Sequence, residues 1–310
     1  MPSAVRIGID LGGTKTAIIA LDEHDMPLIE RRAPTPRGDY DASIATIGRL
    51  IADAEAELGC TGQATVGVAM PGSISPSTGK VQNANSVWLN GREFDADLTA
   101  HLGRPVRLAN DANCLALSES VDGAAEDARS VFAVILGTGC GGGFVHKGEL
   151  VNGPRGIAGE WGHNPLPWPD DDERTPPRCW CGLSGCMEGW VSGPALYRDY
   201  LKHGGDARVA ADAAELCGSA ERCDAAAQGA LNRHMSRLAR GLAMVVNILD
   251  PEIIVLGGGL SRMNHLYDGL SPLMSPFIFA DCGEVTIRPA RHGDASGVRG
   301  AARLWSKAGE

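Results

Sequence analysis

A histidine and three cysteines in the middle of the chain are the residues best suited to bind a metal ion. His163 is followed by Cys179, Cys181 and Cys186. One imidazole and three thiolates form the tetrahedral set of nitrogen and sulfur ligands that Zn²⁺ favours, and four protein ligands leave no open position for water. The pattern therefore predicts a structural zinc site rather than a hydrolytic one, although its Cys-x-Cys spacing differs from the common Cys-x2-Cys.

Two acidic residues flank this cluster. Glu160 lies three residues before His163, and Glu188 lies two residues after Cys186. A metal that fixed the loop would also fix both carboxylates, which are good acceptors for sugar hydroxyls. The acidic run Asp170–Glu173 is expected to be a solvated surface rather than a Mg²⁺ site. The remaining cysteines are expected to be reduced thiols: Cys60, Cys114, Cys140, Cys217, Cys223 and Cys282.

Two glycine-rich stretches have the features of phosphate-binding turns. The first, DLGGTKT (Asp10–Thr16), combines two glycines with a hydroxyl and a cation, and Asp10 would lie where Mg²⁺ bridges the phosphates. The second is GTGCGGG (Gly137–Gly143). Neither is a Walker A loop or a Rossmann fingerprint, and each alone is also explained by a tight hairpin. A third stretch, LGGGL (Leu256–Leu260), would let an adenosine pack against backbone or would simply join a strand to a helix.

The stretch LANDANC contains a candidate general base. Asn110 and Asp111 stand where a strand ends and a helix begins, and ligands bind beyond the carboxyl ends of strands in open α/β sheets. A carboxylate there can accept a hydroxyl proton during phosphoryl transfer. The alternative from spacing alone is that Asp111 caps the following helix.

The elements around these motifs repeat. Residues 5–10, 15–21 and 27–32 read as strands around the first glycine turn, and SVFAVIL, GFVH and ELV repeat that unit around the second. Apolar periodicity predicts helices over 42–58 and 225–249, with Gly59 as a C-cap. Alternating strands and helices indicate an α/β fold. The segment 165–177 reads as a loop, and the last residues as a helix capped by Asp294 or Ser296.

Composition narrows the class of protein. The chain has 310 residues, 44% hydrophobic residues and a net charge of −10, which is typical of a globular protein and unfavourable for nucleic-acid binding. No apolar run is long enough for a transmembrane helix, and we read no signal peptide, so we expect a cytoplasmic protein without membrane partners.

The motifs IGIDLGGTKT, LANDANC, ILGTGCGGG, GEWGH with CWCGLSGCME, and ILDPEIIVLGGG resemble, in this order, those of the ROK family of repressors, open reading frames and sugar kinases. The similarity extends from about Ile7 to Trp305. Within the family, NANSVWLNG, GEWGHNPLPW and ARHGDASGVRGAA are most similar to bacterial fructokinases that also accept mannose.

This resemblance implies an actin-like ATPase (ribonuclease H-like) fold with two lobes and a cleft. Residues 1–115 would form the small lobe, joined by a helix over about 295–310, and 116–294 the large lobe with the zinc loop. It implies Asp111 as the catalytic base and His163 as both zinc ligand and sugar ligand. The implied sugar-binding residues are Asn85, Asn110, Asp111, Glu160, His163 and Glu188. The implied ATP-binding residues are Gly8, Asp10, Gly12, Gly13, Thr14, Lys15, Gly137, Thr138, Gly139, Gly141, Gly257 and Gly258.

The implied reaction is ATP- and Mg²⁺-dependent phosphorylation of a hexose at the C6 hydroxyl. D-fructose is the expected substrate and mannose a secondary one, with glucose or N-acetylglucosamine as alternatives. A sugar-sensing regulator is disfavoured, because the first glycine loop begins by residue 12 and leaves no room for a DNA-binding segment. A homodimer is implied by the family only.

Overall fold

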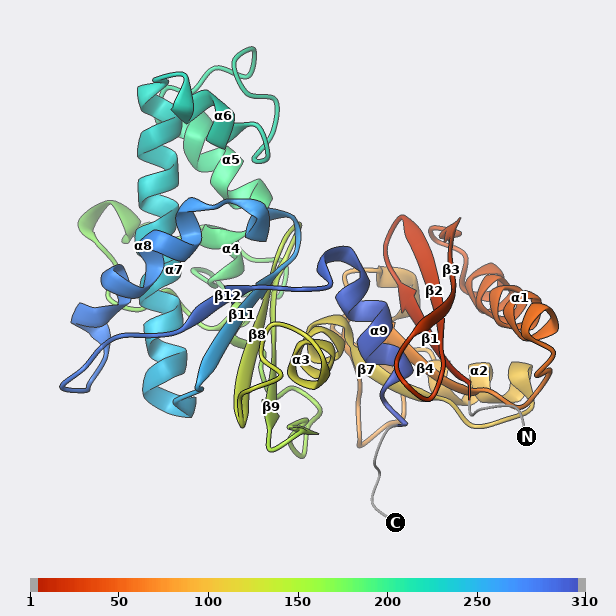
Figure 1. The fold of residues 1–310 in the computed structure, drawn as a ribbon. Coiled ribbons are helices and arrows are strands. Elements are labelled where there is room, and N and C mark those ends of the chain that lie inside the picture. Colours follow the sequence, from red (N-terminus) through yellow and green to blue (C-terminus); the bar gives the residue numbers. More distant parts are fainter. Residues whose placement is uncertain (1–4, 306–310) are drawn as a thin grey trace.

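The computed structural model describes residues 5–305 and contains two five-stranded sheets that lie apart, each with helices on both faces (Figure 1). The first sheet has the strand order β3-β2-β1-β4-β7, and the second has β10-β9-β8-β11-β12. A third, two-stranded sheet pairs β5 with β6. The two large sheets carry the two copies of the repeated unit, which confirms the α/β prediction.

The first half supplies the red to orange elements of Figure 1. Its strands are β1 (Arg6–Leu11), β2 (Lys15–Leu21), β3 (Pro27–Pro34), β4 (Thr65–Met70), β5 (Ser73–Ile74), β6 (Val81–Gln82) and β7 (Arg107–Asn110). Its helices are α1 (Tyr40–Leu58), α2 (Phe94–Leu102) and a 3₁₀ turn, η1 (Val87–Leu89). Apolar residues of β1 and β4, such as Ile9 and Val68, pack against Ile47 and Ile51 of α1.

The second half supplies the yellow to blue elements. Its strands are β8 (Ser130–Leu136), β9 (Cys140–His146), β10 (Glu149–Leu150), β11 (Ile253–Gly257) and β12 (Ile287–Pro289). Its α-helices are α3 (Asp111–Val121), α4 (Glu188–Val191), α5 (Gly193–Lys202), α6 (Leu216–Glu221), α7 (Ala225–Leu249) and α8 (His265–Met274). Short 3₁₀ helices are η2 (Trp161–His163), η3 (Asp171–Glu173), η4 (Gly259–Arg262), η5 (Ser275–Phe277) and η6 (Gly293–Ala295).

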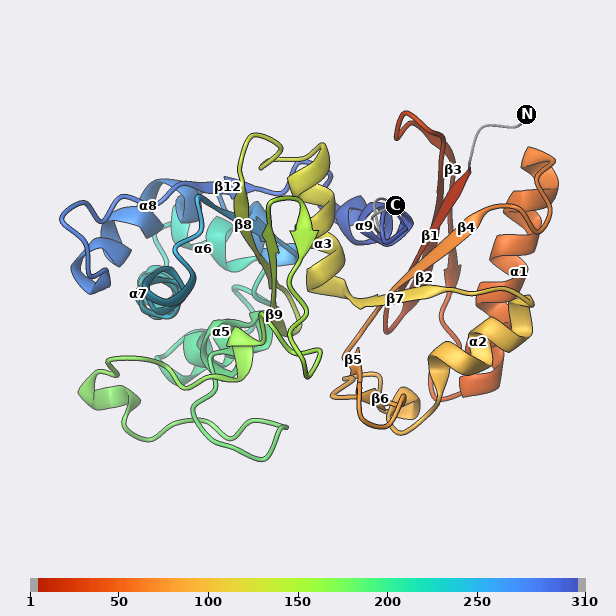
Figure 2. The same ribbon diagram turned by 90° about the horizontal axis from the view of Figure 1, so that it is seen from below.

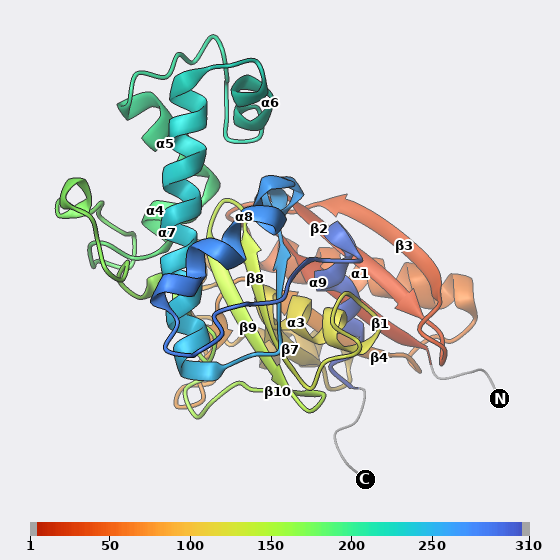
Figure 3. The same ribbon diagram turned by 60° about the vertical axis from the view of Figure 1, so that its left-hand side comes forward.

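The long helix α7 organises the second core. Its buried face, including Leu238 and Leu242, packs in one cluster with Phe132 of β8 and Leu256 of β11. Figure 3 shows α5 and α6 beside the N-terminal end of α7, while α8 crosses α7 farther along the helix. Asp224 caps α7 by accepting from the amides of Ala226 and Ala227.

Helix α3 and the last helix, α9 (Ser296–Ala302), lie side by side between the two large sheets (Figure 2). Glycines permit this close approach. A Cβ on Gly300 would lie 1.8 Å from the carbonyl oxygen of Cys114 in α3, and one on Gly67 would lie 1.9 Å from that of Ala301. The C-terminal helix therefore packs on the first sheet, although it is shorter than expected and residues 306–310 lie outside the described part. The expected boundary at 115/116 falls within α3, so the division into lobes stays a prediction.

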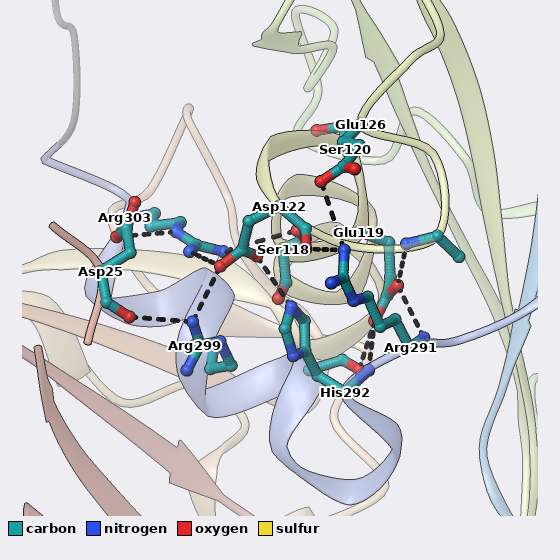
Figure 4. Close-up of polar contacts among 12 residues, drawn as sticks. Asp25, Ser118, Glu119, Ser120, Asp122, Glu126, Arg291, His292, Arg299 and Arg303 are labelled. Carbon is teal, nitrogen blue, oxygen red and sulfur yellow. Dashed lines mark hydrogen bonds and ion pairs between the residues drawn. The ribbon is translucent and has the colours of Figure 1, made fainter. Parts of the chain in front are cut away.

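Polar side chains fasten α3 to α9 (Figure 4). Asp122 accepts from both terminal nitrogens of Arg303, from Arg299 and from His292. The buried Glu119 accepts from the amides of Arg291 and His292 and from the Ser296 hydroxyl, all on the segment that returns from β12 to α9. These donors hold the pKa of Asp122 far below its usual range, although burial by itself would raise it.

The limits of α1 and α7 agree closely with the sequence predictions, whereas the length and the caps of α9 do not. Gly59 ends α1 in the left-handed conformation, as predicted, and Asp39 caps its first turn. The predicted caps of α9 are wrong: its N-cap is Ala295, Asp294 pairs with Lys15 and Arg262, and the Ser296 hydroxyl donates to Glu119.

The acidic run 170–173 is only partly a solvated surface. Glu173 is buried and accepts from Arg237 and Arg240 of α7, which fixes the proline-rich loop against the second core. Burial favours the neutral acid, but the two guanidinium groups prevail and lower the pKa of Glu173 to about 2. The segment 165–177 as a whole is a loop, as expected, and its one short 3₁₀ turn is η3 within the acidic run. Among the helices between residues 5 and 305, none combines the length and apolar character that a membrane span requires.

Candidate functional site

Asp111 is the first residue of α3, directly beyond the carboxyl end of β7. Asn110, not Asp111, is the helix N-cap: its side-chain oxygen accepts from the amide of Ala112, and its amide donates to the carbonyl of Gly72. Asp111 accepts from the same Ala112 amide at 2.8 Å. Burial, together with the nearby charge of Glu160, raises the pKa of Asp111 to about 6. A carboxyl group with such a pKa is suited to proton transfer near neutral pH.

Asp10 lies at the end of β1, near Asp111. Burial raises its pKa to about 7, and the charge of Asp111 adds to this effect. Two neighbouring carboxylates with raised pKa values fit a divalent cation, because the cation would supply the positive charge that they lack. The residues present therefore fit Mg²⁺, with Asp10 as the residue that would hold it.

The first glycine loop is open to solvent. The amide of Gly12 donates to the carbonyl of Lys15, and Gly13, Thr14 and Lys15 are all exposed. Lys15 makes a loose ion pair with Asp294, with 3.8 Å between its ammonium nitrogen and the carboxylate oxygen. Asn85 is exposed, and its neighbour Ser86 has its hydroxyl 4.0 Å from a Cβ placed on Gly13. The predicted sugar ligand Asn85 therefore lies next to this loop.

The second glycine loop is shorter than the sequence indicated. Only Gly137, Thr138 and Gly139 form the turn, because β9 already begins at Cys140. The amide of Gly137 donates to the carbonyl of Gly139, and the carbonyl of Gly137 accepts from the amide of Gly193 at the start of α5. This loop is thus tied to the helices of the second half.

Four glycines expected to touch ATP lie close to other parts of the chain. A Cβ on Gly8 would lie 2.0 Å from the carbonyl oxygen of Val298 in α9. One on Gly141 would meet Ala112 of α3 at 3.4 Å. Cβ atoms on Gly257 and Gly258 would meet Leu115 and the backbone of Leu136 at 2.8 and 2.5 Å. These positions let backbones and helices approach one another, which a glycine pattern in a sequence does not distinguish from ligand binding.

A cavity of about 1260 Å³ opens beside the second glycine loop. It is large enough for a nucleotide, since ligand pockets usually measure a few hundred to about a thousand Å³. The sequence offered no signal for most of its lining, because residues on α5, α7 and α8 look like ordinary helix surface. The lining includes Gly137, Thr138, Pro194, Tyr197, Ala213, Cys217, Leu231, Asn232, Gly259, Leu260, Arg262, Met263, Asn264 and His265.

Glu188 lies where the second glycine loop meets the cysteine-rich loop. One carboxylate oxygen accepts from the amide of Cys140 at 3.2 Å, and the other accepts from the indole N–H of Trp180 at 2.6 Å. Burial raises the pKa of Glu160, and the charge of Glu188 raises it further, whereas His163 opposes the shift. Because the charge of Glu160 acts on Asp111 and that of Glu188 acts on Glu160, these three carboxylates lie near one another and form an acidic surface.

The four predicted metal ligands converge. Their ligand atoms all lie within 4.8 Å of one another, with 3.6 Å between Cys179 Sγ and His163 Nδ1 and 3.6 Å between Cys181 Sγ and Cys186 Sγ. A tetrahedral zinc site places neighbouring ligand atoms about 3.5–3.8 Å apart. All nine cysteines are free of disulfides. The donor set and its spacing therefore fit a closed zinc site, held through Nδ1 of His163.

The loop that carries these ligands is shaped by tight turns. Isolated β-bridges pair Pro165 with Cys186 and Arg178 with Ser184. Gly182 and Gly185 have φ of 94° and 86°, a conformation that side chains rarely adopt. Burial and the neighbouring thiols raise the pKa of Cys186 to about 12, so a metal is needed to keep it ionised at neutral pH.

The two large sheets have matching strand orders, and a cavity lies at the glycine turn of the second sheet. The carboxylate of Asp111 lies between the two sheets. These features define an actin-like ATPase fold. The sequence pattern of the ROK family matches residues 6–308, and the chain belongs to this family. It is 38% identical over 307 residues to an N-acetyl-D-glucosamine kinase of Shigella flexneri, covering 96% of this chain and 98% of the relative. An N-acetyl-D-glucosamine kinase of Photobacterium profundum is also 38% identical, over 301 residues, with the same coverage.

Solved structures agree. The ROK hexokinase from Thermus thermophilus aligns with a TM-score of 0.81 and 31% identity over 96% of both chains. The ROK glucokinase of Streptomyces griseus, solved with glucose and AMPPNP, aligns with a TM-score of 0.79 and 24% identity over 97% of this chain and 99% of that one, which supports the fold. Family membership and the full-length relatives place the chain with the sugar kinases of the family. The predicted fructokinase branch is not supported, because these relatives are N-acetylglucosamine kinases.

Proposed function

We propose that the protein transfers the γ-phosphoryl group of ATP to the C6 hydroxyl of N-acetyl-D-glucosamine. The full-length similarity to N-acetylglucosamine kinases supports this sugar over the fructose expected from the sequence. The observation that carries the chemistry is Asp111, whose pKa is raised to about 6 at the carboxyl end of β7 beside the acidic surface.

In the proposed reaction Asp111 accepts the proton of the C6 hydroxyl. The hydroxyl oxygen forms a bond to the γ-phosphorus while the bond to the leaving ADP oxygen breaks. Glu160, His163, Glu188 and Asn110 orient the sugar hydroxyls, and amides of the two glycine turns orient the phosphates. Mg²⁺, when bound, supplies positive charge to the phosphates. Asp10 is the residue of this chain that would hold it, and Lys15 adds a second cation.

The adenosine would occupy the 1260 Å³ cavity, because this space adjoins the glycine turn 137–139 that is proposed to bind phosphate. Its walls combine apolar residues such as Leu231 and Met263 with amides such as Asn232 and Asn264. Gly12, Gly13 and Thr14 would reach the phosphates from the first half, and Thr138 from the second. Gly8, Gly257 and Gly258 are given a packing role in this proposal, because Cβ atoms there would collide with backbone or with Leu115, and the ATP contact of Gly141 stays a prediction.

Substrate choice is tested by ADP release from Mg-ATP with the purified protein and four sugars: N-acetyl-D-glucosamine, D-fructose, D-mannose and D-glucose. We expect the highest kcat/KM with N-acetyl-D-glucosamine. A higher value with fructose would restore the reading from the sequence motifs. Phosphorylation of none of the four would overturn the proposed activity.

The metal and the oligomer are tested separately. We propose that zinc is bound in one equivalent per chain and is structural, so Cys179→Ser should lose it and raise the KM for the sugar, measured by elemental assay and steady-state kinetics. A zinc-free protein with an unchanged sugar KM would contradict this role. The homodimer implied by the family is tested by light scattering during size-exclusion chromatography.

A further inference from the structure

Trp180 stands between two of the metal ligands and reaches the acidic surface. Its neighbours in the chain are Cys179 and Cys181, and its side chain is 55% exposed. The indole N–H nevertheless donates to one oxygen of Glu188 at 2.6 Å. The ring also lies edge-on to His163, with 5.0 Å between ring centroids and an interplanar angle of 88°. An exposed tryptophan that contacts two proposed sugar ligands has a more specific position than surface packing requires.

The Glu188 side chain is oriented by contacts outside its own short helix. Glu188 begins α4, which is only four residues long, so its side chain depends on external partners for its orientation. The partner on one side is Trp180, and on the other side it is the amide of Cys140, at the end of the glycine turn. A Cβ on Gly139 would lie 2.8 Å from the same carboxylate, so the turn also limits how far Glu188 can move. The carboxylate is therefore held between the cysteine-rich loop and the glycine loop.

This arrangement leaves Glu188 able to bind sugar. A carboxylate has two oxygens with about four acceptor positions, and the bonds from Trp180 and Cys140 use one on each oxygen. The remaining positions are free to accept sugar hydroxyls in a fixed direction. A hydrogen bond to a charged group is stronger than one between neutral groups, so the loss of the indole N–H would release one end of the carboxylate.

We propose that Trp180 is a positioning residue for the sugar. Its indole N–H fixes Glu188, and its place between two cysteine ligands makes this hydrogen bond the link between the metal loop and the sugar site. The inference rests on the proposed sugar kinase function and names a residue that this function alone does not assign.

The test compares two tryptophans of the same loop. Trp180→Phe keeps an aromatic ring beside His163 but removes the N–H, whereas Trp168→Phe changes a tryptophan that is 50% exposed and stacks on Phe277. We expect Trp180→Phe to retain zinc and to raise the Kd and KM for the sugar by about tenfold, with a smaller change in kcat. Trp168→Phe should leave all four quantities unchanged. Calorimetry gives the Kd, and elemental assay gives the zinc content.

A double-mutant cycle separates positioning from general loop structure. If Trp180 acts through Glu188, then Trp180→Phe should add nothing to the loss in sugar affinity caused by Glu188→Gln. Additive losses, an unchanged sugar Kd in Trp180→Phe, or loss of zinc from that variant would each overturn the proposal. The sugar is whichever hexose the wild-type protein phosphorylates fastest, so an error in the proposed substrate leaves this test intact. Wild-type protein that phosphorylates no hexose would refute the proposed function instead.

Discussion

The two glycine turns belong to equivalent strand pairs of two sheets with corresponding order, yet they are built for different tasks. The first turn, between β1 and β2, is open, and charged residues stand beside it in Asp10 and Lys15. The second, between β8 and β9, has no charged residue of its own, and its backbone contacts Glu188 and Gly193. A duplicated framework thus places charged side chains beside the first turn and backbone contacts around the second.

The largest expected effect on activity comes from changing Asp111, the residue that joins the two halves. Asp111 follows the last strand of the first sheet and begins α3, which packs on the second. We expect Asp111→Asn to keep the fold and the zinc but to lower kcat by about a thousandfold, because general base catalysis contributes a factor of this size. Steady-state kinetics, circular dichroism and zinc assay check this. Turnover near the wild-type value would show that another group takes the proton.

The contribution of a buried carboxylate to the free energy of unfolding can be compared between the two halves. Glu173 in the second half accepts from two arginines, whereas Glu55 in the first pairs with Arg104 and accepts from the amides of Gly62 and Ala64. Glu173→Gln should reduce the free energy of unfolding by about 3–5 kcal/mol, because it leaves the buried guanidinium group of Arg240 without its close charge partner and Arg237 with Asp199 alone. Glu55→Gln should cost less. Urea denaturation of both variants gives the comparison, and equal losses would contradict it.

The same carboxylate gives a pH dependence with a definite sign. The pKa of Glu173 is lowered to about 2 in the folded protein, from an ordinary value of 4.5. Its stabilisation is therefore complete above the unfolded value and is lost as the pH falls from about 4.5 toward 2. The stability difference between wild type and Glu173→Gln should shrink across this range, and a difference that is constant with pH would refute the linkage.

The pH dependence of catalysis should show a second effect, which reveals whether Glu160 of the second half helps to set the pKa of Asp111. In the proposed mechanism the carboxylate form of Asp111 accepts the proton, and its pKa is about 6, so kcat/KM should fall tenfold per unit below that pH and level off above it. Glu160 of the second half contributes to this raised pKa through its charge. Glu160→Gln should therefore move the acid limb to lower pH, whatever it does to sugar affinity. An unmoved limb would indicate that burial alone sets the pKa of Asp111.

The smallest expected effects come from adding one methyl group to each glycine turn. In Gly139→Ala the new Cβ would meet Glu188 at 2.8 Å, and the KM for the sugar should rise by a fewfold as the carboxylate shifts. In Gly13→Ala the nearest atom is 4.0 Å away, so the sugar KM should hold while the KM for ATP rises. Equal effects of both variants on the sugar KM would remove the distinction between the turns.

Local chemistry along the chain determined the elements and the metal ligands. Apolar periodicity gave α7 its observed limits, and Gly59 ended α1 as expected, because helix length and termination depend on neighbouring residues. The four proposed zinc ligands were also readable from the sequence, and their ligand atoms lie together in the structure, since three thiols and an imidazole in one glycine-rich loop have few other uses.

Only the tertiary structure decided what each glycine and each carboxylate does. Gly8 and Gly257 resemble ligand-binding glycines in the sequence, but they accommodate α9 and Leu115, which come from distant parts of the chain. In the sequence Glu173 looks like a surface charge, but in the folded protein it accepts hydrogen bonds from Arg237 and Arg240 of α7. The bond from Trp180 to Glu188 likewise requires the loop to fold back on itself. Such roles depend on contacts between segments far apart in sequence, and local pattern carries no information about them.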